Sequence, residues 1–155
     1  MNDKRKLVAA DLFGTPTFFA RFVRQPDRGY VVDFPDLAGC LTEGENIEKA
    51  TVAAKEALSG WLYVALKHGD EIPPPRVFNG RSYRPILPDL DVSIALTILW
   101  ARRRRALTQA QVARALGISQ QAYRKYEVPG QSNPTIGALA RIAEVLGLVV
   151  SVKVA

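Results

Sequence analysis

A run of polar side chains near the end of the chain is suited to reading base edges in DNA. Gln120 and Gln121 stand at the start of a predicted helix, and glutamine makes bidentate hydrogen bonds to adenine. Arg124 and Lys125 follow about one turn later and add positive charge, which favours contact with phosphates. The spacing predicts a recognition helix over Ser119–Glu127 that enters a major groove.

The residues before this helix predict how it is held at the surface. Thr108 and Gln111, three residues apart, form the pattern of a helix capping box. Gly117 supplies the left-handed backbone that a helix end requires, and Ala113 lets two helices meet closely. Ser119 is suited to cap the next helix and to donate to a phosphate. Together these residues predict a helix-turn-helix.

Two further helices complete the predicted second half. The first is expected over Val92–Arg105, and its final run Arg102–Arg105 is interpreted as a solvated helix end. The last begins after Thr135, ends at Gly147, and carries an apolar stripe at helical spacing. The stripe consists of Ile136, Leu139, Ile142, Ala143 and Leu146.

The carboxylates of the first half raise the question of enzymatic chemistry. Asp33 and Asp36 lie three residues apart across a predicted turn, and Glu43 and Glu45 flank another. Hydrolysis with two metal ions needs several carboxylates converging from neighbouring strands. No further acid stands at a suitable place, so these residues are interpreted as turn and edge acids.

The remaining reactive residue types favour structural roles. His68, the only histidine, lies at a predicted helix C-terminus, where a capping or solvated role is expected. Cys40 is the only cysteine and lies in an apolar strand, which favours packing. The metal-binding and nucleotide-binding motifs CxxC, HExxH and GxxxxGK[ST] do not occur. We therefore expect no enzyme activity, no metal and no cofactor.

The first half is predicted to be an α+β layer in the order β-β-β-α-β. Strands are expected over Thr17–Val23, Gly29–Phe34 and Cys40–Glu43, because aromatic and β-branched residues are separated by turn residues. A helix over Ile47–Lys67 carries small and apolar residues at helical spacing. Arg81–Leu87 is expected to be an edge strand, since Pro85 cannot donate to a ladder.

Charge divides the chain in the same way. The net charge is +6, and residues 91–155 account for all of it, with nine basic and three acidic residues. Residues 27–71 carry nine acidic and four basic residues, a balance of −5. A basic half suggests a phosphate-rich partner, and an acidic block suggests a basic partner or a solvated face. No apolar run is long enough to span a bilayer, and a cytoplasmic location is expected.

Residues 92–148 resemble the helix-turn-helix family of lambdoid phage repressors. The pattern LTQxxxAxxLGIS, a glutamate after the recognition helix, NPT and LARIAEVLG carry the resemblance. It implies that Gln109 contacts phosphate and supports Gln120, and that Gln121 and Lys125 also face bases. It also implies that part of Arg102–Arg105 contacts phosphate. Ala106 departs from the pattern, because the family usually has glycine there. Spacing and resemblance together give these DNA-binding candidates: Gln109, Ser119, Gln120, Gln121, Arg124, Lys125 and Asn133.

The first half resembles the HicB antitoxin family. The segment GYVVDFPDLAGCLTEG, followed by a helix with AKEAL, carries this resemblance over about residues 17–90. It implies a truncated, partial RNase H-like fold that binds and blocks HicA, a small basic ribonuclease toxin. Residues 1–16 match no pattern. The candidates for the toxin-binding surface are Tyr30, Asp33, Asp36 and Glu43.

These observations predict a toxin-binding domain over 17–90 and a DNA-binding and dimerisation domain over 91–155. The first hypothesis is an antitoxin that represses its own operon. The second is a ligand-sensing transcriptional regulator whose α+β half binds a small molecule. The third is a weak ribonuclease. A neighbouring gene for a small basic protein would favour the first hypothesis, and a metabolic gene would favour the second.

The C-terminal tail is the predicted dimerisation device. Residues 148–154 alternate as a strand would, with Val150, Val152 and Val154 on one side. A helix-turn-helix reads one half-site, so two copies related by symmetry are expected on an operator. Pairing of the tail with its counterpart would satisfy its backbone groups. The alternatives are a tail that frays or folds back on the first-half sheet.

Overall fold

The computed structural model describes residues 15–151 of the chain. They divide into two compact units, with the boundary between Ser93 and Ile94. The first unit is an α+β layer and the second is helical, which confirms the predicted fold class. Each unit is described by itself.

Four antiparallel strands form the sheet of the first unit, in the spatial order β3-β2-β1-β4. The hairpin places Phe22 opposite Val32, and the outer pairing places Phe18 opposite Ile86. The predicted hairpin and the predicted edge strand with Pro85 are confirmed. The bounds are β1 Phe18–Arg24, β2 Tyr30–Asp33, β3 Leu41–Gly44 and β4 Tyr83–Ile86.

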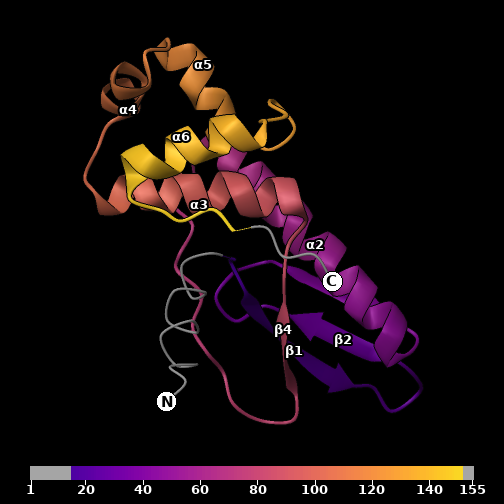
Figure 1. Ribbon diagram of the computed structural model, residues 1–155. Coiled ribbons are helices and arrows are strands. Elements are labelled where there is room, and N and C mark those ends of the chain that lie inside the picture. Colours follow the sequence, from indigo (N-terminus) through magenta and orange to yellow (C-terminus); the bar gives the residue numbers. More distant parts are fainter. Residues whose placement is uncertain (1–14, 152–155) are drawn as a thin grey trace. The chain divides into compact units, whose positions relative to one another are not determined.

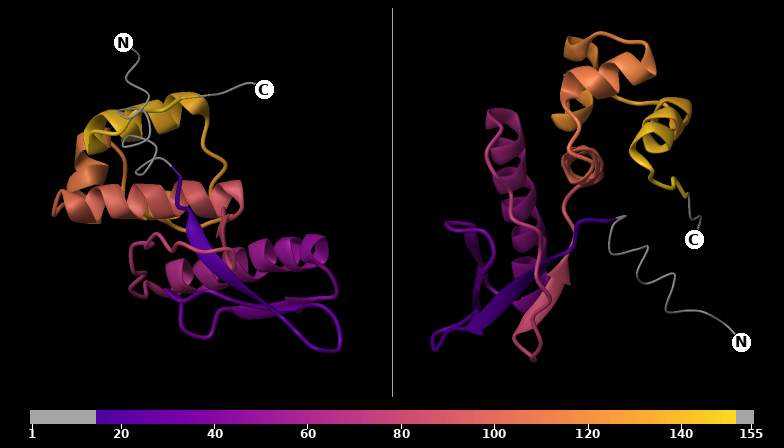
Figure 2. Two further views of the ribbon diagram at one scale, coloured as in Figure 1. Left: turned by 90° about the horizontal axis from the view of Figure 1, so that it is seen from below. Right: turned by 90° about the vertical axis from the view of Figure 1, so that its left-hand side faces the viewer.

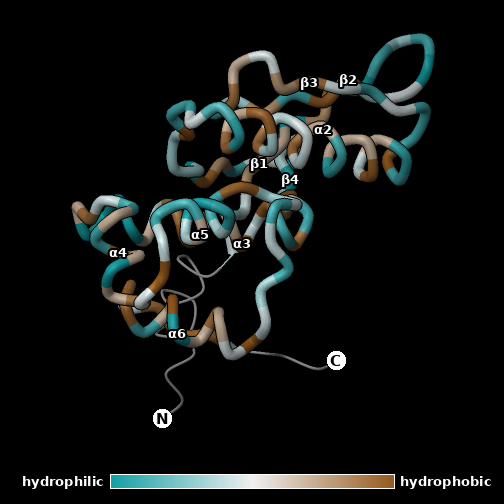
Figure 3. The backbone as a smooth tube through the Cα atoms, turned by 90° about the horizontal axis from the view of Figure 1, so that it is seen from above, coloured by the Kyte–Doolittle hydropathy of each residue, from teal (hydrophilic) through white to brown (hydrophobic). Residues whose placement is uncertain are grey.

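Helix α2 (Ile47–His68) lies along one face of this sheet (Figures 1 and 2). Asn46 caps its first turn by accepting from the Lys49 N–H, and Gly69 ends it with a φ of 76°. Hydrophilic and hydrophobic stretches alternate along the helix (Figure 3), as an amphipathic helix requires. The buried apolar core between helix and sheet includes Phe18, Ala20, Phe22, Val32, Ala50, Ala54, Leu58 and Leu62.

The approach of α2 to the sheet depends on a glycine at the end of β3. A Cβ added to Gly44 would overlap the backbone of Ala50 in the first turn of the helix. Glycine is therefore the residue that lets β3 turn directly into the packed helix.

The second unit is built from four α-helices and one 3-10 turn among the described residues. Helix α3 begins at Leu90, before the boundary, and continues through Arg104. The core of the unit is formed by Ile98, Ala101, Val112, Ala113, Leu116, Tyr123, Ile142 and Leu146. The other bounds are α4 Gln109–Leu116, α5 Gln120–Arg124, η1 Lys125–Glu127 and α6 Ile136–Leu146.

Two details differ from the sequence prediction. The recognition segment is α-helical only to Arg124 and then tightens into the 3-10 turn η1. After η1, Val128 is extended, which the following Pro129 favours. Ile136 is 66% exposed and does not belong to the packed stripe of α6.

The predicted C-terminal strand is only partly covered by the structure. Residues 148–151 are neither helix nor strand in this single chain. Val152 and Val154 lie outside the described residues.

In the part of the chain that the structure describes, no helix is long and apolar enough to cross a membrane.

Candidate nucleic-acid interface

Helices α4 and α5 form the predicted helix-turn-helix, and the caps fix its geometry. The Thr108 hydroxyl accepts from the Gln111 N–H at 3.1 Å, and the Gln111 side chain accepts from the Thr108 N–H at 2.8 Å. Gly117 closes α4 with a φ of 69°. Ser119 then caps α5, because its hydroxyl accepts from the Ala122 N–H at 3.1 Å. The capping box and the glycine turn predicted from sequence are confirmed.

The outer side of α5 and η1 is polar and exposed. The side chains of Gln120, Gln121, Arg124 and Lys125 are all exposed. Tyr123 lies on the opposite side and is fully buried in the core of the unit. This short segment therefore exposes two amide and two cationic side chains to solvent, while the ring of Tyr123 packs into the core beneath it.

Glu127 is the centre of a buried network beneath this surface. Arg102 of α3 donates to its carboxylate from Nε at 2.5 Å and from Nη2 at 2.9 Å. The Tyr123 hydroxyl donates at 2.8 Å and Gln109 Nε2 at 2.9 Å. The side chains of Arg102 and Glu127 are only 12% and 4% exposed. The network joins the end of the recognition segment to α3 and to the start of α4.

The electrostatics of this network follow from its burial. Burial alone would raise the pKa of Glu127, but the donors Arg102, Gln109 and Tyr123 outweigh it and lower that pKa. The hydrogen bond to Glu127 raises the pKa of Arg102. Burial and the neighbouring carboxylate raise the pKa of Tyr123. The pair is therefore ionised, and the tyrosine is a neutral donor.

The structural role of Arg102 is not visible in the sequence. The pattern predicts a solvated helix end over Arg102–Arg105, yet the Arg102 side chain is mostly buried and also donates to the Leu107 carbonyl at 2.8 Å. Twenty-five residues separate Arg102 from Glu127, so no local pattern could reveal the pairing. The glutamate that closes the repressor-like pattern was the one available signal.

Two other DNA-binding candidates occupy different environments. Gln109 is half-buried and already donates to Glu127, so a phosphate contact would have to use its remaining groups. Asn133 lies exposed in the loop before α6. Their contacts with DNA remain predictions.

Ala106, where the resemblance expects glycine, is the only described residue other than glycine with a positive φ, at 52°. It lies in the link between α3 and α4, directly before Leu107. The left-handed region is strained for a residue with a Cβ. The departure from the pattern therefore falls at a position where the backbone favours glycine.

The four candidates for toxin binding have different environments in the first unit. Asp33 forms a bidentate ion pair with Arg21, whose Nε and Nη2 donate to the carboxylate at 2.9 and 3.1 Å. The carboxylate of Asp36 is 6% exposed and accepts from Arg76 at 2.6 and 2.8 Å. Tyr30 is half-buried and Glu43 is exposed on β3. A role for any of them in binding a partner remains a prediction.

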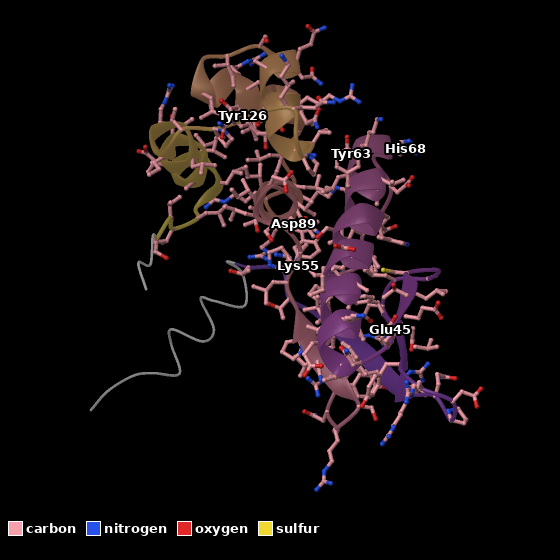
Figure 4. The ribbon with its side chains drawn as sticks, turned by 90° about the vertical axis from the view of Figure 1, so that its right-hand side faces the viewer. Glu45, Lys55, Tyr63, His68, Asp89 and Tyr126 are labelled. Carbon is pink, nitrogen blue, oxygen red and sulfur yellow. The ribbon has the colours of Figure 1, made fainter. Side chains whose placement is uncertain are left out.

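The residues considered for catalysis are not assembled into a site. Burial raises the pKa of the Cys40 thiol to about 11, which makes it a poor nucleophile. His68 is exposed at the end of α2 (Figure 4). Within residues 15–151, no group of histidine, cysteine and carboxylate side chains could hold a metal ion.

Comparison with known proteins identifies both units. A family model described as the HicB-like antitoxin of bacterial toxin–antitoxin systems matches residues 19–99, about half of the chain. The chain belongs to the HicB-like antitoxin family. A second family model, described as helix-turn-helix, matches residues 98–149.

Two individual proteins are similar to this chain over part of its length. The chain is 33% identical to antitoxin HicB of Escherichia coli K12 over 92 residues, covering 59% of this chain and 66% of that protein, just under two thirds. It is 29% identical over 72 residues to an uncharacterised 14.9 kDa protein of Haemophilus phage HP1, covering 46% of this chain and 54% of that protein. The antitoxin family and the helix-turn-helix are thus both established for this chain.

Proposed function

We propose that this HicB-like antitoxin sequesters a small, basic, HicA-like ribonuclease toxin and represses its own operon by sequence-specific DNA binding. The observation that carries the proposal is the joining of an antitoxin-family unit to a helix-turn-helix with an exposed polar reading side. On this proposal, residues 17–90 bind the toxin and residues 91–155 bind the operator, in the cytoplasm.

The DNA-binding half of the proposal is supported by the surface of α5 and η1. Gln120 and Gln121 are exposed at the start of the segment, where a recognition helix contacts bases. Arg124 and Lys125 supply positive charge for neighbouring phosphates. The buried Glu127 network fixes the segment before it meets DNA, so little ordering free energy is lost on binding.

The toxin-binding half is supported by charge. Residues 27–71 carry a balance of −5, which favours a cationic partner and accelerates its association. Inhibition would occur by covering the toxin's active site and would require no chemistry from this chain. The chain would therefore act without enzymatic activity or a cofactor.

A dimer is part of the proposal, because an operator with two half-sites is read by two copies related by a two-fold axis. Val150, Val152 and Val154 are its proposed contacts. A chain lacking residues 149–155 is expected to be monomeric by light scattering. A truncated chain that stays dimeric would place the interface elsewhere.

The principal experiment is a gel-shift titration of the full chain on DNA from upstream of its own gene. The double variant Gln120→Ala/Gln121→Ala is expected to lose discrimination among operator variants, since a bidentate base contact contributes about 1–3 kcal/mol. Lys125→Ala should weaken binding on all sequences and flatten its dependence on salt. The matched controls Gln25→Ala and Lys67→Ala, both in the first unit, should bind as the wild type does. Sequence-specific, full-strength binding by the double variant would overturn the assignment.

A ligand-sensing regulator is the alternative function, and the neighbouring gene distinguishes the two. If the chain binds its operator but the product of an adjacent small basic reading frame is not neutralised in co-expressing cells, the antitoxin half of the proposal fails and the alternative is favoured.

A further inference from the structure

The outer edge of β3 presents backbone groups that β2 does not use. In the ladder, the Phe34 N–H donates to the Cys40 carbonyl at 3.1 Å. Because hydrogen-bonded and non-hydrogen-bonded pairs alternate in an antiparallel ladder, Thr42 bonds to Val32. The amide and carbonyl groups of Leu41 and Glu43 therefore point away from β2.

The opposite edge of the same sheet is closed by proline. The Phe22 N–H donates to the Ser82 carbonyl at 2.7 Å, so by the same alternation Pro85 occupies an outward position on β4. Proline has no N–H, and it is a common device for preventing addition of a further strand. Strand β3 carries neither proline nor lysine.

The side chains of β3 also favour a partner. Leu41 is 64% exposed, and with Glu43 it lies on the sheet face opposite α2, because Thr42 shares the face of the buried Val32. No described strand pairs with the outer edge of β3. An exposed edge with an apolar side chain and unused backbone donors is a template for strand addition.

Charge distinguishes between possible partners. Residues 29–48, which contain β2, β3 and the start of α2, hold five acidic and no basic residues. Arg21 and Arg76 neutralise Asp33 and Asp36 from outside this segment. The other three acids are Glu43, Glu45 and Glu48.

Of these three carboxylates, Glu43 lies on β3, Glu45 lies between β3 and α2, and Glu48 lies in the first turn of α2. Lys49 pairs with Glu45, which is labelled in Figure 4. Among residues 15–151, no ion pair neutralises Glu43 or Glu48. A second copy of this edge would bring like charges together, whereas a cationic strand would be attracted.

We propose that the outer edge of β3 receives a strand of the cationic toxin, which extends the four-stranded sheet. The added strand would exchange hydrogen bonds with the backbone of Leu41 and Glu43. It would place an apolar side chain beside Leu41 and a lysine or arginine beside Glu43. This inference rests on the proposed antitoxin function and adds where and how the partner binds.

The test is a pull-down and titration of the purified full chain with the co-expressed product of the adjacent small basic reading frame. Leu41→Pro removes an outward N–H and the apolar contact while leaving the β2–β3 hydrogen bonds in place. Glu43→Lys keeps the backbone and reverses the charge. Each is expected to weaken partner binding at least about tenfold, since each removes a hydrogen bond or a charge contact from the edge. Glu56→Lys, an equal charge reversal on an exposed position of α2, should bind as the wild type does.

Operator binding and circular dichroism of each variant establish that it is folded. If Leu41→Pro does not fold, Glu43→Lys decides the question. Wild-type partner affinity in a folded Glu43→Lys would overturn the inference and leave the antitoxin function intact. If Leu41→Pro, measured without the partner, formed a smaller oligomer than the wild type but bound the partner with unchanged affinity, the inference would also be overturned. The edge would then be assigned to a second copy of this chain. A wild-type chain that binds no partner would contradict the proposed function itself.

Discussion

Arginine–carboxylate pairs occur in both units, but they are buried to very different degrees. In the first unit the side chains of Arg21 and Asp33 are 49% and 30% exposed, and their pair lies on the sheet surface. In the second, those of Arg102 and Glu127 are 12% and 4% exposed. The surface pair is screened by water and contributes little, whereas the buried pair depends on every one of its hydrogen bonds. Breaking the same type of ion pair therefore costs little stability where it is exposed and much more where it is buried.

The largest effect is expected from breaking the buried pair. Glu127→Gln leaves the Arg102 guanidinium buried without a counter-charge, which typically costs about 3–5 kcal/mol. The free energy of unfolding of the second unit, measured with urea, should fall by that amount, and operator affinity should fall with it. Glu144→Gln, at an exposed position of α6, should change neither. A second unit that unfolds as in the wild type would mean that the network is not needed for stability.

The same pair predicts a dependence on acid. The pKa of Glu127 in the folded chain is lowered, and that of an unfolded glutamate is about 4.3. The stabilisation is therefore complete above the unfolded value and is lost as the pH falls through the lower folded value. The Tm of the wild type should fall between neutral and acid pH, and the fall should be smaller in Glu127→Gln. Equal pH profiles for the two chains would contradict an ionised Glu127.

Asp36 and Asp33 allow buried and exposed carboxylates to be compared within the first unit. The Asp36 carboxylate is 6% exposed but its partner Arg76 is 68% exposed. Asp36→Asn should cost about 1–3 kcal/mol, because the Nε–H and backbone N–H of Arg76 lose a buried, charged acceptor. Asp33→Asn should cost less than about 1 kcal/mol, as surface pairs do. Urea denaturation of both variants measures the loss in free energy of unfolding. Equal losses would show that burial of the carboxylate does not determine how much the ion pair stabilises the fold.

Local signals predicted much of this molecule, and long-range contacts were missed. Thr108 and Gly117 lie within a few residues of the groups that they cap, so sequence spacing was enough to predict them. Turn residues between aromatic and β-branched runs predicted the hairpin, and Pro85 predicted the edge position of β4, because these signals are local too. Partners such as Arg102 and Glu127, or Asp36 and Arg76, are brought together only by the tertiary fold.

The end of the recognition helix shows the same limit. Helical spacing continues past Arg124, but the chain tightens at Lys125. The inward anchoring of Tyr123 and Glu127 by the buried network, followed by Pro129, accompanies this change. Such an anchor is not visible in a periodic pattern.

The smallest effect is expected at Ala106, which lies in the link between α3 and α4. Its φ of 52° is left-handed, and that conformation costs a residue with a Cβ about 1–2 kcal/mol. Glycine removes this strain but adds about 0.4–1 kcal/mol of unfolded-state entropy. Ala106→Gly should therefore stabilise the second unit by about 0.5–1 kcal/mol and raise its Tm by a few degrees. Ala140→Gly is the matched control, because Ala140 is exposed in the interior of α6, where glycine lowers helix stability by about 1 kcal/mol. Calorimetry of both variants should give shifts of opposite sign, and a loss of stability in Ala106→Gly as large as that in Ala140→Gly would contradict the strain.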